Sequence, residues 1–173
     1  MSKAEINQDA KANDKVFRSS EFFQIGIVVK NIKDTLEFFR SVMEIGDVQE
    51  IDVSYPTAEY YGKVAGYRGK RAFLYFGPVQ IELIELIDGK TIHEDFLKEK
   101  GEGLHHICFQ VKDLETAKKK AAKAGLEVTQ GYSRADGMGF AYLNSDKVGG
   151  VIFEIAQMPA NSNPKDITAT LKK

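Results

Sequence analysis

Alternating apolar and polar residues along the chain predict short strands and amphipathic helices. Residues 22–29 are almost all apolar and rich in β-branched side chains, which is typical of a buried strand. Asn31 is a good N-cap, and apolar side chains then recur at the spacing of one helix face. These are Ile32, Leu36, Phe39 and Met43. Gly46 is expected to end this helix.

The same order of elements is predicted twice. In the first half, strands follow the helix at residues 51–55, 71–76 and 79–86, the last two joined through Gly77 and Pro78. The second half begins with a strand at 104–111 and a helix that Asp113 caps and Gly125 ends. Further strands are predicted at residues 127–130, 139–143 and 151–156. A short helix at 93–101 separates the halves, and residues 55–69 are predicted to form a loop.

The two halves also repeat in sequence. Residues 24–32 align with residues 106–114 at an offset of 82, and residues 77–83 align with residues 149–155 at an offset of 72. We therefore predict an α+β fold in which two tandem βαβββ modules form one curved mixed sheet. The single domain would span residues 21–158, with modules at about 22–87 and 103–157. Residues 1–20 and 159–173 are predicted to be polar tails.

A polar side chain with metal-binding ability stands at each matched position of the repeat. Gln24 and His106 begin their strands, and Glu82 and Glu154 sit between apolar neighbours in theirs. Residues at alternate positions of a strand share a face, so a curved sheet can bring the four groups into one cleft. The alternatives are a solvent-facing Glu82, a Gln24 that hydrogen-bonds a neighbouring strand, and histidines that simply begin a strand.

Composition and charge narrow the class of partner. The chain has 24 Lys and Arg against 25 Asp and Glu, which disfavours nucleic acid or an anionic membrane as the main partner. No apolar stretch is long enough to span a bilayer, and the first residues lack the apolar core of a signal peptide. The lone Cys108 cannot form an internal disulfide and is expected to be a packed, inert thiol. These features favour a cytoplasmic protein.

Four segments in order resemble the vicinal oxygen chelate superfamily, which includes glyoxalase I, methylmalonyl-CoA epimerase, bleomycin-resistance proteins and extradiol dioxygenases. They are residues 79–85, 101–115, 139–143 and 149–154, and they are most similar to methylmalonyl-CoA epimerase-like members. The resemblance implies one divalent metal ion, which could be Ni, Co, Zn, Mn or Mg, with Gln24, Glu82, His106 and Glu154 as ligands. It also implies a homodimer. His105 is expected to face away from this site, and His93 to lie on the surface.

The resemblance further implies proton transfer next to a carbonyl through a metal-stabilised enediolate, with Glu154 as the catalytic base. The substrate would be a small oxo-acid, a CoA thioester or a hemithioacetal. Epimerisation needs a second acid/base group, but the stretch 62–69 that matches its place in the family contains no carboxylate. Glu59 is the nearest, and Tyr60, Tyr61 or Tyr67 could substitute.

Gln24 departs from the family pattern, because the superfamily usually has histidine there. A neutral amide oxygen is a weaker ligand than imidazole for ions such as Zn or Ni. Two function classes stay open as a result. One is a metal-dependent lyase, isomerase or epimerase; the other is a non-catalytic small-molecule-binding protein of the resistance type. An extradiol dioxygenase needs two histidines and one carboxylate on iron, and fits less well.

Overall fold

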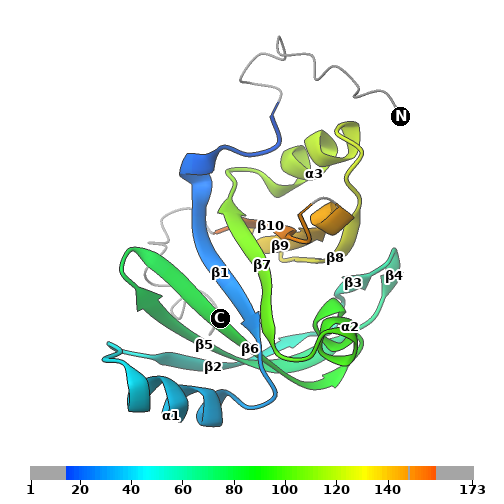
Figure 1. The fold of residues 1–173 in the computed structure, drawn as a ribbon. Coiled ribbons are helices and arrows are strands. Elements are labelled where there is room, and N and C mark those ends of the chain that lie inside the picture. The colour runs from blue at the N-terminus through cyan, green and yellow to red at the C-terminus, as the bar shows by residue number, and fades with distance from the viewer. Residues whose placement is uncertain (1–14, 148, 159–173) are drawn as a thin grey trace, which may run out of the picture.

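The described chain forms one long mixed sheet with three α-helices (Figure 1). The computed structural model describes residues 15–147 and 149–158. In chain order its elements are η2 (Ser19–Glu21), β1 (Phe22–Val28), α1 (Ile32–Val42), β2 (Gln49–Tyr55), β3 (Glu59–Tyr60), β4 (Lys63–Val64), β5 (Tyr67–Phe76), β6 (Val79–Gly89), α2 (Ile92–Glu99), β7 (Gly103–Gln110), α3 (Leu114–Lys123), β8 (Val128–Ser133), β9 (Gly139–Leu143), η3 (Ser145–Lys147) and β10 (Ile152–Gln157).

The predicted repeat is confirmed by the sheet order, β2-β5-β6-β1-β7-β10-β9-β8-β3-β4. The first module contributes β1-β6-β5-β2 and the second contributes β7-β10-β9-β8, each counted outward from the centre. Strand β1 is parallel to β6, β7 is parallel to β10, and the two modules meet where β1 and β7 pair antiparallel. The sheet curls into a half-barrel, so the α+β prediction is confirmed (Figure 1).

The prediction that residues 55–69 form a loop is wrong in part. Strands β3 and β4 form a small hairpin there, and β3 pairs with β8 of the other module. Strand β5 also begins earlier than predicted, at Tyr67, and pairs with β2 along its first residues. The glycines and tyrosines of this segment suggested an irregular loop, but backbone pairing with the other module gives it regular structure.

The helix caps are confirmed, but one helix end is not. Asn31 accepts a hydrogen bond from the Asp34 amide, and Asp113 accepts one from the Thr116 amide. Helix α1 ends at Val42 rather than near Gly46. Ile45 and Val48 follow this end of the helix, and both pack against the same core as Ile32 and Leu36.

Helices α1 and α3 pack against one face of the sheet. Helix α1 buries Ile32 and Leu36 against Ile81 and Leu83 of β6. Helix α3 likewise buries Leu114 and Ala117 against Ala141 and Ile155. Since side chains alternate along a strand, Gln80 and Glu82 of β6 point to the opposite face, inside the curl.

The predicted N-terminal tail is packed where it is described. The Phe17 ring stacks on the Phe109 ring with 4.4 Å between centroids, just before β1 begins. Residues 1–14 and 159–173, which hold the rest of both predicted tails, lie outside the described residues. No helix in the described part of the chain is long and apolar enough to cross a membrane.

Candidate metal site and cleft

Four neighbouring strands carry the four candidate ligands. Gln24 is on β1, Glu82 on β6, His106 on β7 and Glu154 on β10, and these strands are consecutive in the sheet. All four side chains are buried, with at most 8% of Glu82 exposed. The solvent-facing alternative for Glu82 is therefore wrong.

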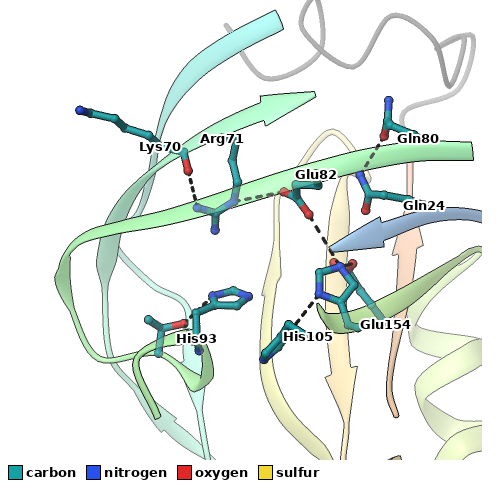
Figure 2. Close-up of polar contacts among 10 residues, drawn as sticks. Gln24, Lys70, Arg71, Gln80, Glu82, His93, His105 and Glu154 are labelled. Carbon is teal, nitrogen blue, oxygen red and sulfur yellow. Dashed lines mark hydrogen bonds and ion pairs between the residues drawn. The ribbon is translucent and has the colours of Figure 1, made fainter. Parts of the chain in front are cut away.

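Glu82, His106 and Glu154 converge. One ligand atom from each lies within 4.8 Å of the other two. His106 Nε2 is 3.7 Å from one Glu82 oxygen and 2.9 Å from Glu154 Oε2 (Figure 2). Yet neither His106 Nε2 nor Glu154 Oε2 has a hydrogen-bond partner of acceptable geometry, although both atoms are fully buried. Buried polar atoms are rarely left unsatisfied, so a cation shared by both atoms fits this arrangement.

Gly26 makes room for the His106 ring. It is the register partner of Glu82 on β6 and of His106 on β7, so it lies between the two ligands. A Cβ atom at Gly26 would stand 1.9 Å from His106 Cε1. The imidazole thus lies over the backbone of β1, and only glycine permits that position.

Gln24 lines the same cleft but is anchored by its amide nitrogen. The nitrogen donates a hydrogen bond to Gln80 Oε1 at 2.8 Å, and Gln80 in turn donates to the Tyr75 hydroxyl. The hydrogen bond that the purely structural alternative for Gln24 requires is therefore present. Its role as a ligand stays a prediction; the oxygen that would bind a metal is on the side of the amide away from Gln80 (Figure 2).

Arg71 is a site residue that the sequence reading missed. It is 3% exposed, and its Nε lies 3.1 Å from Glu82 Oε1. Burial raises the pKa of the Glu82 carboxyl, while the guanidinium beside it acts in the opposite direction. A charged residue within the otherwise apolar run 71–76 was the signal that could have found it.

The candidates for a second acid/base group are only partly near this site. The Tyr60 hydroxyl donates a hydrogen bond to Asp95, and Tyr61 is largely exposed. The Tyr67 hydroxyl is buried without a hydrogen-bond partner, and burial raises its pKa well above the usual value. Tyr67 can therefore donate a proton in a hydrogen bond but is a poor base.

The expectation that His93 lies on the surface is wrong, whereas His105 is buried outside the group formed by Glu82, His106 and Glu154. His93 is 1% exposed, because its position in α2 turns it toward the sheet instead of solvent. His105 is 2% exposed, and its Nδ1 lies 3.1 Å from Nδ1 of His106. Burial lowers the pKa of His93 well below 6.5 and that of His105 to about 2, so both rings are neutral.

An aromatic cleft opens beside the polar groups. Gln24, Glu82 and Glu154 line it together with aromatic rings and methionines. The aromatic residues are Phe23, Tyr55, Phe73 and Phe140. Cys108 lies fully buried in β7, and burial raises its pKa, as expected for a packed thiol.

Comparison with known proteins agrees with this architecture. The profile of the Glyoxalase/Bleomycin resistance protein/Dioxygenase superfamily matches residues 23–142. The chain belongs to this superfamily. Among curated proteins, the uncharacterized protein YqjC of Bacillus subtilis is 27% identical over 135 residues, which are 77% of this chain and 89% of that protein.

Two solved structures show the same fold. A hypothetical protein, BH1468 of Bacillus halodurans, is 26% identical with a TM-score of 0.59, covering 82% of this chain and 96% of that one. Methylmalonyl-CoA epimerase from Mycobacterium tuberculosis is 18% identical with a TM-score of 0.60, covering 87% and 92% respectively. The likeness to the epimerase concerns the fold, on which unrelated chemistries occur.

Proposed function

We propose that this protein catalyses proton transfer at the carbon next to a carbonyl group, assisted by one divalent metal ion. The single observation that carries the proposal is the convergence of Glu82, His106 and Glu154 with two fully buried atoms lacking hydrogen-bond partners. Such a set of one imidazole and two carboxylates fits Mn, Co, Ni, Zn or Mg. The substrate would be a small oxo-acid, a CoA thioester or a hemithioacetal.

The surroundings of each residue favour a different role in this reaction. Glu82, His106 and Glu154 would hold the metal ion, with Gln24 as a fourth ligand through its amide oxygen. A divalent ion there would act as a Lewis acid on the substrate's carbonyl oxygen. Glu154 would take and return the proton, since one of its oxygens has no hydrogen-bond partner, whereas Glu82 is held by Arg71.

One base suits an isomerase or lyase better than an epimerase. Epimerisation at a carbon needs acid/base groups on both faces of the carbanion. The charged partner of Glu82 is Arg71, and a guanidinium cannot accept a proton at any ordinary pH. Tyr67 does not line the cleft, and burial raises its pKa well above the usual value, so it does not supply the second base either.

A second candidate is a non-catalytic small-molecule-binding protein on the same fold. The observation in its favour is that the first module already satisfies its polar groups, Gln24 through Gln80 and Glu82 through Arg71. The aromatic lining of the cleft would then bind an apolar or aromatic ligand.

The deciding experiment is deuterium exchange at the α-carbon of candidate oxo-acids and thioesters, followed by NMR with and without added Mn²⁺ or Co²⁺. We expect metal-dependent exchange that Glu154→Gln slows by about 10²–10⁴-fold. Glu50→Gln is the matched control, because Glu50 is exposed on β2. Compounds that perturb cleft resonances without any exchange, with or without metal, would support the binding protein instead.

A further inference from the structure

All three histidines of the 173-residue chain lie in one buried cluster. One ring nitrogen from each of His93, His105 and His106 lies within 4.8 Å of the others. The rings of His93 and His105 are side by side, with 4.7 Å between centroids (Figure 2). Proton transfer at Glu154 uses only His106, so the other two are unexplained by the proposed function.

The hydrogen bonds around His93 fix which of its nitrogens carries the proton. Gln130 Oε1 accepts hydrogen bonds from the Ile92 amide and from the Thr91 hydroxyl. Because that hydroxyl has a single proton, Thr91 Oγ1 must accept at its 2.9 Å contact with His93 Nδ1. His93 Nδ1 is therefore protonated, and Nε2 carries a lone pair. That lone pair is fully buried and has no partner.

The pair of neighbouring histidines on β7 offers two more nitrogens. Nδ1 of His105 and Nδ1 of His106 are 3.1 Å apart, and His105 Nε2 is buried without a partner. Two nitrogens that each lie about 2.0–2.1 Å from one Zn²⁺ are separated by about 3.0–3.4 Å in common geometries. Their separation thus suits a shared ion as well as a hydrogen bond. One nitrogen of each of the three rings lies within 4.8 Å of the others, close to the limit of about 4.2 Å for two ligands of one zinc ion.

We propose that His93, His105 and His106 form a second, imidazole-only site for a borderline divalent ion such as Zn²⁺. A neutral imidazole has one lone pair, so His106 serves either this site through Nδ1 or the carboxylate site through Nε2. When Nδ1 binds the ion, Nε2 carries the proton and faces Glu154 Oε2 at 2.9 Å. The two sites therefore compete for one residue.

Ligand chemistry and charge separate the ions that the two sites prefer. Three imidazoles favour zinc, nickel or copper, whereas the two carboxylates with His106 also suit manganese and magnesium. The carboxylates contact His106 through Nε2, whereas the charged side chain that acts on both His93 and His105 is Arg71, which opposes a cation there and favours ions that bind imidazole strongly. The identity of the metal would thus decide which tautomer of His106 is populated.

The test counts imidazole ligands by X-ray absorption on untagged protein purified after growth with added zinc. The decisive sample is Glu154→Gln, which weakens the carboxylate site but keeps the Arg71–Glu82 ion pair. We expect it to hold one Zn²⁺ with three imidazoles, and wild-type protein to bind zinc with at least two. His93→Asn keeps a donor for Thr91 while removing Nε2, and should weaken zinc binding at least about 10-fold.

Other outcomes overturn the second site. If Glu154→Gln retains no zinc, or if its zinc has a single imidazole, then His93 and His105 only support His106. Equal zinc affinity of His93→Asn and wild type would also show that His93 is not a ligand. The count of imidazole ligands is made on proteins that keep all three histidines, so it does not depend on a histidine variant that could misfold. Because α-deuterium exchange is measured separately with Mn²⁺ on wild-type protein, failure of the proposed function and failure of this site are distinguishable.

Discussion

The first-module pair, Gln24 and Glu82, and the second-module pair, His106 and Glu154, occupy equivalent places in equivalent modules. Their neighbours differ. Gln24 is the register partner of Gln80 on β6, whereas His106 is the register partner of Ile152 on β10. The amide side chain of Gln80 accepts a hydrogen bond from Gln24, whereas the side chain of Ile152 cannot form a hydrogen bond with His106.

The two carboxylates differ in the same way. Phe73 of β5 pairs with Glu82, and Tyr142 of β9 pairs with Glu154. Two residues before each of these, the first module has Arg71 and the second has Phe140. Each ligand of the first module thus has a polar partner on a neighbouring strand, whereas in the second module His106 contacts His105 through Nδ1 and its Nε2 has no hydrogen-bond partner. The comparison teaches that the second-module pair is the more available for a metal ion.

Replacing Arg71 should produce the largest effect. In Arg71→Met, Glu82 loses its cation while staying buried, so we expect the metal-free protein to lose about 3–5 kcal/mol of stability. Added Mn²⁺ should restore more stability in this variant than in wild type. Urea unfolding with and without Mn²⁺ measures both. Arg68→Met, at an exposed arginine on the same strand, should change little; equal behaviour of the two variants would contradict the pairing.

Substitution of Gly26 should disable the second-module pair without touching either ligand. In Gly26→Ala the new Cβ would clash with the His106 ring, so we expect about a 100-fold loss of metal affinity. Gly46→Ala is the control, because nothing lies within 4 Å of a Cβ there. Metal titration by calorimetry compares the two, and unchanged affinity in Gly26→Ala would place His106 outside the site.

The buried histidines behind His106 predict acid sensitivity. The folded-state pKa values of His93 and His105 are lowered, so their contribution to stability is present above about pH 6.5 and is lost as the pH falls below it. Each should contribute a slope approaching about 1.4 kcal/mol per pH unit below pH 6. Urea unfolding in chelator between pH 7.5 and 5 measures the slope. His93→Asn should reduce it, and an unchanged slope would mean that His93 titrates normally.

Transferring the second-module arrangement to the first should give the smallest effect. Gln24→His with Gln80→Leu creates an imidazole beside an apolar neighbour, as at His106 and Ile152. We expect Co²⁺ affinity to rise about 10-fold, because imidazole is a stronger ligand than an amide. Gln80→Leu alone is the control. A double variant that binds Co²⁺ no better than wild type would show that position 24 does not reach the ion.

The sequence was sufficient for what the two modules share. Hydrophobic periodicity and the near-repeat predicted both βαβββ units and both helix caps, because those follow from local patterns. They also predicted that Gln24, Glu82, His106 and Glu154 would meet on four strands. Their roles as ligands, the domain boundaries, the homodimer and the cytoplasmic location stay predictions.

What the sequence did not reveal depends on contacts between distant segments. Arg71 reaches Glu82 across the β5–β6 pair, and His93 is buried by the way α2 lies against the sheet. Glu85 on β6 accepts a hydrogen bond from the Ile32 amide at the start of α1. Such pairings are specified by the tertiary packing, which no periodicity along the chain encodes.

The most direct test of the unequal pairs is one metal titration of three untagged proteins: wild type, Gln24→Ala and Glu154→Gln, with Mn²⁺ as the ion. If the second-module pair dominates, Glu154→Gln should weaken binding at least about 100-fold and Gln24→Ala by no more than about 3-fold. A loss of affinity in Gln24→Ala that equals or exceeds the loss in Glu154→Gln would contradict the account.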